Sequence, residues 1–561
     1  MSIDSPDAII VGSGAGGGTA ARVLTQRGMN VVVLEKGRHW TADDFLPYDE
    51  LHFLEHRALT PGMNDVNVYV DSAGKRQRVQ RWWIGNMVGG ATVLWEANLP
   101  RYTSEDFTVL DVLKEVPAGA SMVNWPWTYD EFQPWFERAE HEWGVSGKAN
   151  QNERQEPTRP GYDYPMPPIR PHASTKFLQW AFGRAGMKPY LSPRGINSRT
   201  YDGRPGCPFC GFCQGFGCAV NDRASSTNTV LARALATGRC DLRTGHCVTR
   251  VVHEKGRVSG VAYKTELDGP ELVLTAPLVF VSIQAIESAR LFLLSEIPDP
   301  HKMIGHYLTY HTKGTAEITF PSHPVWDEGP DRLFQPRTAL GSLQLRDLYV
   351  IDDPDTYLTK GGKFSIYDPL TVAPPIKVLR ATGYEPQRPK ELWGKALTGR
   401  LVELREQAGV SFSFTGETLS TYDNRVELDD QEKDPWGLPA ARVFYTHPQY
   451  DVDLSKYCLE KVCRIMADAG GQIRRFDPQK PENPGYGHNH GTLRAGTDPH
   501  ASVLDADCQS HTVSGLYVLD SAFMPTAGAS NPTLTQIANA YRVCESVAAS
   551  FDRSRSKAVT A

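Results

Sequence analysis

Apolar positions near the start of the chain form two short runs separated by a glycine-rich segment. The first run spans Asp7 to Val11 and is followed by a loop and then by a helical pattern from Thr19 to about Arg27. The second run, Val31 to Leu34, ends in Glu35. This order of strand, loop, helix, strand and acid predicts the first half of a dinucleotide-binding α/β fold.

The glycines of the loop have the spacing GxGxxG. Gly12 would allow the tight turn, Gly14 would let the backbone approach a pyrophosphate, and Gly17 would let the helix pack closely on the strand. Glu35 lies where an acid meets ribose hydroxyl groups, and it disfavours a 2′-phosphate. A glycine-rich loop alone is typical of an ordinary turn, whereas the complete order of elements favours a cofactor site. The motif does not distinguish FAD from NAD.

Polar and apolar residues alternate in the block from about residue 320 to residue 480, as in Val410 to Phe414. This period of two predicts an antiparallel sheet, which we expect to pack over the cofactor site. Because 561 residues are too many for one ordinary core, we expect two domains that interleave along the chain.

Composition and charge narrow the class of ligand. The chain has 59 basic and 65 acidic residues and a formal net charge of -6. Without a long run of like charge, neither nucleic acid nor an anionic membrane surface is an expected partner. No apolar stretch approaches the roughly 18 residues of a membrane span. The charge pattern favours a small molecule as ligand. The N-terminus lacks the basic-then-apolar pattern of a secretory signal, so we expect folding in the cytoplasm.

Four of the ten cysteines have the close spacing C-x2-C-x2-C-x4-C. They are Cys207, Cys210, Cys213 and Cys218. The pattern resembles the thiolate run that binds an iron–sulfur cluster, whereas structural zinc usually takes two pairs separated by a longer loop. Zinc, a disulfide and unligated thiols remain alternatives. The other cysteines are expected to be buried apolar residues.

Three more segments carry motifs that occur together in one enzyme family. They are residues 88–95 with Gly89, Gly90 and Thr92, residues 488–496, and residues 515–535. In sequence and order they resemble the glucose/methanol/choline (GMC) oxidoreductases. The resemblance implies an α/β fold in which a Rossmann-like FAD-binding domain is combined with a discontinuous substrate domain built on an antiparallel sheet. It also assigns Gly89, Gly90 and Thr92 to FAD contacts.

The resemblance makes His488 the catalytic base, four residues before Thr492, with His490 as the nearest rival or support. Oxidation of an alcohol removes the hydroxyl proton while the carbon-bound hydrogen leaves as a hydride toward flavin N5. An imidazole suits the proton because its ordinary pKa is about 6.5. For an arbitrary histidine, hydrogen bonding to loop backbone is the more common role, but the motif favours catalysis.

Asn531 stands where GMC enzymes have His or Asn to hold the substrate oxygen. It is also a typical N-cap, because Pro532 and Thr533 would open a helix to about Ser550 whose positive end faces the flavin. The two roles are compatible. Asp520 ends a strand, so we expect it to contact the ribityl or pyrophosphate part of FAD, with a simple strand-end turn as the alternative.

Two positions depart from the relatives. Leu94 occupies the place of a flavin-linking histidine, so we expect FAD to be bound non-covalently. Gln284 lies where many relatives have glycine. The predicted FAD-binding domain comprises residues 1–125, 200–320 and 480–561, with the cysteine loop at 206–219. The predicted substrate domain comprises residues 126–199 and 321–479.

Residues 424–429 and 434–439, with the cysteines, resemble one branch of the family. Its members are the catalytic subunits of bacterial gluconate 2-dehydrogenase, FAD glucose dehydrogenase and especially glucoside 3-dehydrogenase. The resemblance implies a carbohydrate substrate, a 3Fe-4S or 4Fe-4S cluster, a small partner subunit and a cytochrome c acceptor. The chain would then stay in the cytoplasm or reach the periplasm with a signal-bearing small subunit.

Three features of this interpretation are left open. An oxidase would reduce oxygen directly and would contain no iron. An electron-transfer subunit would lack substrate chemistry, against which His488 and Asn531 argue. Aromatic residues of the sheet block would stack on sugar rings or, for most of them, form core; they include Trp326, Tyr357, Tyr367 and Trp393.

Overall fold

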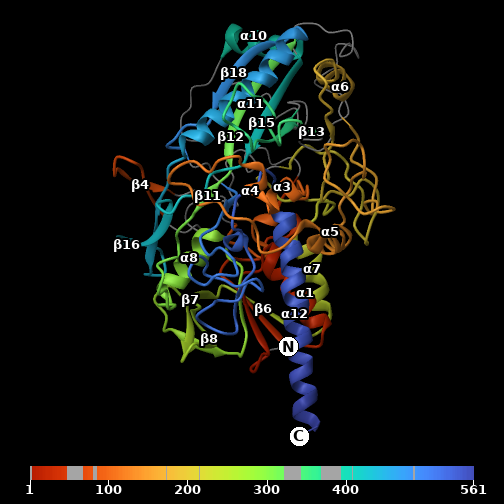
Figure 1. Cartoon of the computed structure of the whole chain (residues 1–561). Helices are drawn as coiled ribbons and strands as arrows, with labels where there is room; N and C mark the ends of the chain where they lie inside the picture. Colours follow the sequence, from red (N-terminus) through yellow and green to blue (C-terminus); the bar gives the residue numbers. More distant parts are fainter. Residues whose placement is uncertain are drawn as a thin grey trace.

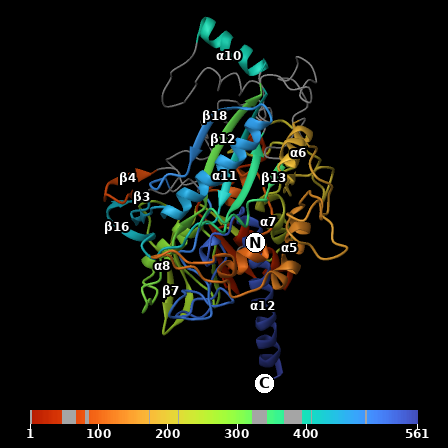
Figure 2. The same ribbon diagram turned by 45° about the horizontal axis from the view of Figure 1, so that its top comes forward.

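Two sheets dominate the fold and lie toward opposite ends of the molecule (Figures 1 and 2). The computed structural model describes residues 3–46, 67–79, 85–171, 174–213, 215–320, 343–367, 393–406, 408–483 and 487–560. For residues 403–406, 408 and 552–560 only the backbone is described. Trp326 lies outside the described residues.

The first sheet is parallel, with five strands in the order β20-β10-β1-β2-β6. Its strands are β1 (Ala8–Val11), β2 (Val31–Glu35), β6 (Cys240–Thr244), β10 (Val279–Val281) and β20 (Leu516–Val518). Strands β1, β2 and β10 are buried along their whole length, as expected where helices cover both faces of a parallel sheet. The predicted Rossmann-like arrangement is confirmed.

The helices around this sheet come from both ends of the chain. Helix α1 (Ala15–Gln26) contacts α7 (Val230–Ala236) and α12 (Thr533–Thr560), and α12 also contacts α5 (Tyr129–Trp143). Helix α1 begins earlier than the sequence pattern indicates because Gly16 to Gly18 are already helical. Helix α12 continues past its expected end, and its C-terminal part projects from the rest of the molecule (Figure 1).

The second sheet is antiparallel, with six strands in the order β18-β12-β15-β14-β13-β5. Its strands are β5 (Tyr190–Leu191), β12 (Thr312–Phe320), β13 (Leu343–Leu345), β14 (Gly362–Tyr367), β15 (Ala408–Gly416) and β18 (Gln472–Pro478). In β15, Phe412 and Phe414 are buried in a core shared with α11 (Gln449–Asp468). Ser411 and Ser413 are partly exposed, so the predicted antiparallel sheet is confirmed.

Strand register places polar side chains in rows on the face of this sheet that is turned away from α11. Thr415 of β15 pairs with Lys313 of β12 on one side and with Lys363 of β14 on the other. Ser413 pairs with Ser365 in the next row. Because side chains on one face recur every second residue, these rows share one surface. We call it the polar face.

The remaining strands form small sheets at the edges. They are β3 (Asn67–Val70), β4 (Arg76–Val79), β16 (Arg425–Lys433) and β17 (Pro439–Phe444) in one sheet, β7 (Cys247–Glu254), β8 (Arg257–Lys264) and β9 (Leu272–Thr275) in another, and the pair β11 (Thr309–Tyr310) and β19 (Asn489–His490). Since β11 leads directly into β12, the pair holds residues around 489 beside the antiparallel sheet.

Short helices connect these elements. They are η1 (Ala42–Asp44), η4 (Gly90–Val93), α3 (Ser104–Phe107), α4 (Val109–Val112), α6 (Thr175–Arg184), η5 (Ser226–Asn228), α8 (Ala285–Leu294), α10 (Gly394–Glu406) and η8 (Ser521–Phe523). Among the described residues, no helix has the length and apolar character needed to cross a membrane.

The two large sheets are each assembled from distant parts of the chain. The parallel sheet combines strands between residues 8 and 281 with residues 516–518, and the antiparallel sheet combines strands between residues 190 and 478. Strand β12 lies inside the 200–320 segment that we assign to the FAD-binding domain, yet it belongs to the antiparallel sheet. The domain boundaries stay a prediction.

Candidate active site

A cavity of about 570 Å³ lies between the two large sheets. Residues that follow β1, β2, β10 and β20 line one side, so the carboxyl edge of the parallel sheet forms this wall. Lys313, Ser365 and Thr415 line the other side from the polar face. The carboxyl edge of an open parallel sheet is the usual place for a ligand in such folds.

The glycine loop is shaped as the motif predicts. Gly12 has a φ of 90°, which a residue with a side chain adopts only with strain. A Cβ atom on Gly17 would overlap the carbonyl oxygen of Gly12, whereas a Cβ on Gly14 would have its nearest neighbour 3.9 Å away. Gly14 lines the cavity at the start of α1. The bare backbone there fits a pyrophosphate at the positive end of the helix.

Glu35 is buried at the end of β2 and ties the loop together. Its carboxylate accepts hydrogen bonds from the backbone N–H of Ser13 (3.1 Å), the Ser13 hydroxyl (2.6 Å) and the N–H of Gly37 (2.9 Å). Burial raises the pKa of this carboxyl. Glu35 also lines the cavity, so its predicted contact with ribose hydroxyls is compatible with its position.

The second predicted FAD segment packs directly on the glycine loop. The N–H of Gly89 donates to the Ser13 hydroxyl (2.9 Å), and the Thr92 hydroxyl accepts from the N–H of Ser226 (2.9 Å). A Cβ on Gly90 would lie 3.0 Å from the Cα of Gly14. The structure therefore brings Gly89, Gly90 and Thr92 together with the glycine loop, as one cofactor cradle requires.

Leu94, the residue in place of a flavin-linking histidine, is buried and lines the cavity. Its side chain has no nucleophile, which fits the non-covalent FAD that we predict.

Asp520 closes the cavity from the end of β20. Its carboxylate accepts from the N–H groups of Ile283 and Ala522, each at 2.9 Å, and from the hydroxyl of Ser288. Burial raises the pKa of Asp520. The contact with Ala522 forms the local strand-end turn that was the alternative, whereas Ile283 and Ser288 contact the carboxylate from distant parts of the chain. Asp520 also lines the cavity, so its predicted FAD contact stays a prediction.

Gln284 adopts a backbone conformation that normally belongs to glycine, with φ 80° and ψ 148°. Its side-chain oxygen accepts from the N–H groups of Ile286 (2.9 Å) and Glu287 (3.3 Å), and so caps α8. The cap offsets part of the backbone strain. Where many relatives have a glycine, this chain has a glutamine whose side chain caps α8.

We predict that Gln284→Ala lowers the free energy of unfolding by about 2 kcal/mol, because the cap is lost while the strained backbone remains. Gln284→Gly loses the same cap but relaxes the backbone, so it should be about 1 kcal/mol more stable than the alanine variant. Urea unfolding of the FAD-loaded proteins measures both. Equal stability of the two variants would show that the backbone of residue 284 is not strained.

His488 and Asn531 meet at the other end of the cavity. The side-chain nitrogen Nδ2 of Asn531 lies 3.4 Å from Nε2 of His488, and both residues line the cavity. His488 is held in the left-handed region with a φ of 60°. Residues 43 positions apart in sequence thus converge on one point.

The hydrogen bonds of a neighbouring histidine define the tautomer of His488. Nε2 of His311 lies 3.0 Å from the carbonyl oxygen of Ala527, which only accepts, so His311 carries its proton on Nε2. Burial holds the pKa of His311 well below its ordinary value, so its Nδ1 is a bare acceptor. Nδ1 of His488, 2.9 Å from that atom, therefore donates to it, and the ammonium of Lys313, 3.5 Å from the same Nδ1, makes no hydrogen bond there. This leaves a lone pair on Nε2 of His488, facing Asn531.

His490 lies behind this pair. It is fully buried on β19, its ring centroid is 4.8 Å from that of His311, and neither of its ring nitrogens makes a hydrogen bond within the described residues. Burial lowers the pKa of His490 to about 3. His490 is not among the residues that line the cavity, and this placement favours His488 over its rival as the base.

The start of α12 lies beside Asn531. Pro532 and Thr533 line the cavity, and the carbonyl oxygen of Pro532 accepts from the N–H of Gln536 (3.0 Å). The positive end of α12 therefore faces the cavity, where it favours negative charge. The oxygen Oδ1 of Asn531 accepts from Asn98 (3.1 Å) and Lys363 (2.7 Å).

Comparison with known proteins agrees with this geometry. Two family models described as GMC oxidoreductase match residues 6–313 and 420–540. The chain belongs to the GMC oxidoreductase family. The structure of a formate oxidase variant from Aspergillus oryzae RIB40 has the same fold, with a TM-score of 0.65, 13% identity and coverage of 99% of this chain and 100% of that chain. GMC oxidoreductases use FAD to oxidise CH–OH groups, and the cradle and cavity described above fit that cofactor.

Several curated GMC relatives span nearly the whole chain. The 6'''-hydroxyparomomycin C oxidase of Streptomyces lividus is 28% identical, with coverage of 97% of this chain and 91% of the relative. The 2-methyl-1,2-propanediol dehydrogenase of Mycolicibacterium austroafricanum is 27% identical, with coverage of 98% and 96%. The gluconate 2-dehydrogenase flavoprotein of Pantoea cypripedii is 24% identical, with coverage of 94% and 91%.

The four clustered cysteines of this GMC oxidoreductase are not arranged as metal ligands. In the part of the chain that the structure describes, no three His, Cys, Asp or Glu side chains converge on a point that could hold a metal ion. Burial raises the pKa of Cys207 and Cys218, and that of Cys213 to about 12. The thiol of Cys218 contacts Asp222 at 3.6 Å. This arrangement does not fit the predicted iron–sulfur cluster.

Motif reading did not find Lys313, Lys363 and His311. Lys313 lines the cavity, and its ammonium donates to Thr415 (3.0 Å) and lies 3.5 Å from Nδ1 of His488. Burial lowers the pKa of Lys313 to about 8. Lys313 of β12 and Lys363 of β14 lie on the same face of the sheet, on either side of Thr415. This could have indicated a site, but it requires knowledge of the strand register. Of the four aromatic candidates, Tyr367 lines the cavity, whereas Tyr357 and Trp393 are exposed.

The pKa of His488 is held well below its ordinary value, first by burial and then by the nearby charges of Lys313, His490 and Lys363. A base works in its neutral form, so we predict that the rate constant for flavin reduction falls with decreasing pH only below about pH 6.5. Unfolding restores the ordinary pKa of His311, His488 and His490, so the unfolded chain binds more protons below about pH 6.5. The free energy of unfolding therefore also falls below about pH 6.5. Stopped-flow reduction and melting curves between pH 4 and 9 test both; a half-maximal rate above pH 6.5 would contradict the assignment.

Proposed function

We propose that this GMC oxidoreductase is a sugar dehydrogenase that oxidises a secondary hydroxyl group or the anomeric carbon of a glucoside, an aldose or gluconate, with a glucoside as the favoured substrate. The observation that carries the proposal is the polar face opposite His488 and Asn531. Ser365, Ser413 and Thr415 line the cavity there, together with Lys313. Hydroxyl and ammonium groups suit a ligand with many hydroxyl groups better than an apolar alcohol.

His488 and Asn531 act on the same substrate oxygen. The hydroxyl proton goes to the lone pair on Nε2 of His488, while Nδ2 of Asn531 donates to the oxygen and holds it in place. The 3.4 Å between the two nitrogens allows one oxygen to contact both from the cavity side. FAD, when bound, supplies the acceptor for the hydride at N5. The positive end of α12 favours the negative charge that develops on the substrate oxygen.

The relatives support an alcohol or sugar substrate. Their names describe oxidation of 6'''-hydroxyparomomycin C, 2-methyl-1,2-propanediol and gluconate. Another relative is the fructose dehydrogenase large subunit of Gluconobacter japonicus, at 23% identity. The description "large subunit" supports a small partner subunit. An external acceptor such as cytochrome c is part of the proposal. Because the cysteines do not fit a cluster, we route no electron transfer through them. Iron and sulfide analysis with EPR spectra tests that prediction separately.

Anaerobic mixing of the purified flavoprotein with single compounds tests the proposal. The panel comprises methyl α-D-glucopyranoside, D-glucose, D-gluconate, 2-methyl-1,2-propanediol and paromamine. We expect a sugar, and the glucoside most rapidly, to bleach the flavin absorbance. Bleaching by the diol alone would overturn the choice of substrate class, and bleaching by none of the compounds would leave the protein without the proposed activity.

The acceptor distinguishes the alternative function, an oxidase that uses oxygen. After reduction by the sugar that reacts fastest, we expect reoxidation by cytochrome c or a dye to exceed reoxidation by air. Stoichiometric peroxide at a comparable rate would establish the oxidase instead.

A further inference from the structure

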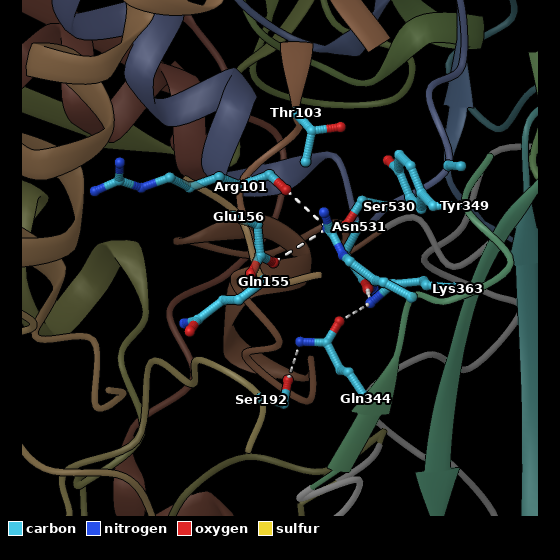
Figure 3. Close-up of polar contacts among 12 residues, drawn as sticks. Arg101, Thr103, Gln155, Glu156, Ser192, Gln344, Tyr349, Lys363, Ser530 and Asn531 are labelled. Atoms are coloured by element: carbon cyan, nitrogen blue, oxygen red, sulfur yellow. Dashed lines mark hydrogen bonds and ion pairs between the residues drawn. The ribbon is translucent and has the colours of Figure 1, made fainter. Parts of the chain in front are cut away.

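Lys363 is a fully buried lysine on β14 that contacts the carboxamide of Asn531. Its ammonium nitrogen lies 2.7 Å from Oδ1 of Asn531 and 2.9 Å from Oε1 of Gln344 (Figure 3). Within the described residues, no carboxylate forms an ion pair with Lys363. Burial lowers the pKa of Lys363 well below its ordinary value, although the charge of Glu156 acts in the opposite direction. A buried lysine with no direct ion pair is costly, so its contacts need an explanation beyond stability.

The nitrogen of Lys363 donates to both neighbouring amide oxygens, and this fixes the amides around it. The side-chain oxygens of Gln344 and Asn531 must both face Lys363. Gln344 then has only its Nε2 to offer on the other side, and this atom donates to the hydroxyl of Ser192 (2.8 Å). The direction of both hydrogen bonds is thus set by one side chain.

The second arm returns to the same oxygen. The Ser192 hydroxyl donates to Oδ1 of Asn98 (2.8 Å), which turns Nδ2 of Asn98 toward Asn531. That nitrogen donates to Oδ1 of Asn531 (3.1 Å). Two paths of hydrogen bonds therefore connect Lys363 to Oδ1 of Asn531. One is direct, and the other passes through Gln344, Ser192 and Asn98.

Ser530, the residue before Asn531, is held by contacts that do not involve Lys363, Gln344, Ser192 or Asn98. Arg346 donates to the hydroxyl of Ser530 and to the carbonyl oxygen of Arg101, each at 2.9 Å, and pairs with Glu156 at 3.1 Å. The position of the asparagine is thus held from one side, and the rotation of its amide is held from the other.

We propose that Lys363 is a positioning residue that fixes the carboxamide of Asn531 with its NH2 group toward His488 and the substrate oxygen. The inference rests on the role proposed above for Asn531. With Oδ1 occupied twice, only Nδ2 faces Nε2 of His488. A donor at that point keeps the lone pair of His488 in place and stabilises the substrate oxygen. A flipped amide would present an acceptor there and would lose both effects.

The test is a double-mutant cycle between Lys363→Met and Asn531→Ala. We expect Lys363→Met to slow flavin reduction by the fastest sugar of the panel about tenfold or more. In the Asn531→Ala background the same change should slow it by no more than about twofold, because the amide on which Lys363 acts is gone. Equal effects in both backgrounds would overturn the proposal. FAD content and melting temperature report folding, and Lys363→Gln, which keeps a donor, replaces the methionine variant if that variant does not fold.

A second readout needs no substrate. The pKa of His488 is measured in the FAD-loaded protein by NMR of 13C-labelled histidine, with His488→Ala to assign the signal. Lys313 on β12, His311, His490 on β19 and Lys363 all face His488. Lys363→Met should raise this pKa, since the freed amide can turn its oxygen toward protonated Nε2.

Loss of the lysine charge alone would raise the pKa as well, but it would do so equally when residue 531 is alanine. A larger rise with Asn531 present supports positioning, and an equal rise reduces Lys363 to a charge effect. If no sugar reduces the flavin, the proposed function fails while this measurement still decides the role of Lys363. As a matched control, Gln344→Leu keeps the direct bond from Lys363 to Asn531, so we expect a smaller effect on both readouts.

Discussion

His488→Ala is expected to slow flavin reduction about a thousandfold while FAD remains bound. A positioned general base contributes about a hundred- to ten-thousand-fold, and this one also loses the contact between Nε2 and Asn531. The remaining cavity keeps its glycine cradle, which lies at the other end. Stopped-flow reduction by the panel sugar and the visible spectrum of the purified variant measure the two effects.

His500→Ala is the matched control, because His500 lies on an exposed loop and should leave the rate unchanged. A His488→Ala variant that reduces its flavin at near-normal rate would show that another group takes the proton. A colourless variant would instead place His488 in cofactor binding.

Gly14→Ala is expected to abolish stable FAD binding without destabilising the polypeptide. The new Cβ would meet nothing closer than 3.9 Å in the protein, but it would occupy the space where the backbone approaches the pyrophosphate. We expect FAD affinity to fall at least about a hundredfold, because the close contact is lost at the start of α1. Fluorescence titration of the apoprotein with FAD measures the affinity, and melting of the apoprotein measures the stability.

Gly17→Ala provides the contrast. Its Cβ would overlap the carbonyl oxygen of Gly12 inside the protein itself, so this variant should melt at lower temperature even without FAD. If both variants lose FAD and stability to the same extent, the separate roles of the two glycines are wrong.

The N-terminal half of the cofactor site was predictable because its residues are close in sequence. Strand, glycine loop, helix and Glu35 follow one another within a short segment, and local propensity and spacing carry the information. The antiparallel sheet was predictable for the same reason, since the alternation around Phe412 is local. The start of α1 was placed too late because the buried glycines of its first turns have low helix propensity.

The reactive end depended on contacts that spacing does not encode. Lys363 and Asn531 are 168 residues apart, and His311 and His488 are 177 apart. Their meeting follows from strand register and from the pair β11 and β19, which only the folded chain displays. The cysteine spacing had the opposite weakness. It indicated a metal strongly, but spacing alone does not turn thiols toward a common point, and the structure does not place them so.

The antiparallel sheet also has a consequence for how this enzyme can change. On β12, β14 and β15, odd-numbered residues such as Lys313, Ser365 and Ser413 point to the cavity side, while even-numbered neighbours such as Phe364 and Phe412 pack in the core with α11. Substitutions at the odd positions that line the cavity, such as Ser365 and Ser413, can therefore remodel substrate choice and leave the interior intact. Evolution, or a designer building a library, has in these strands a set of tunable sites already separated from the residues that keep the molecule folded.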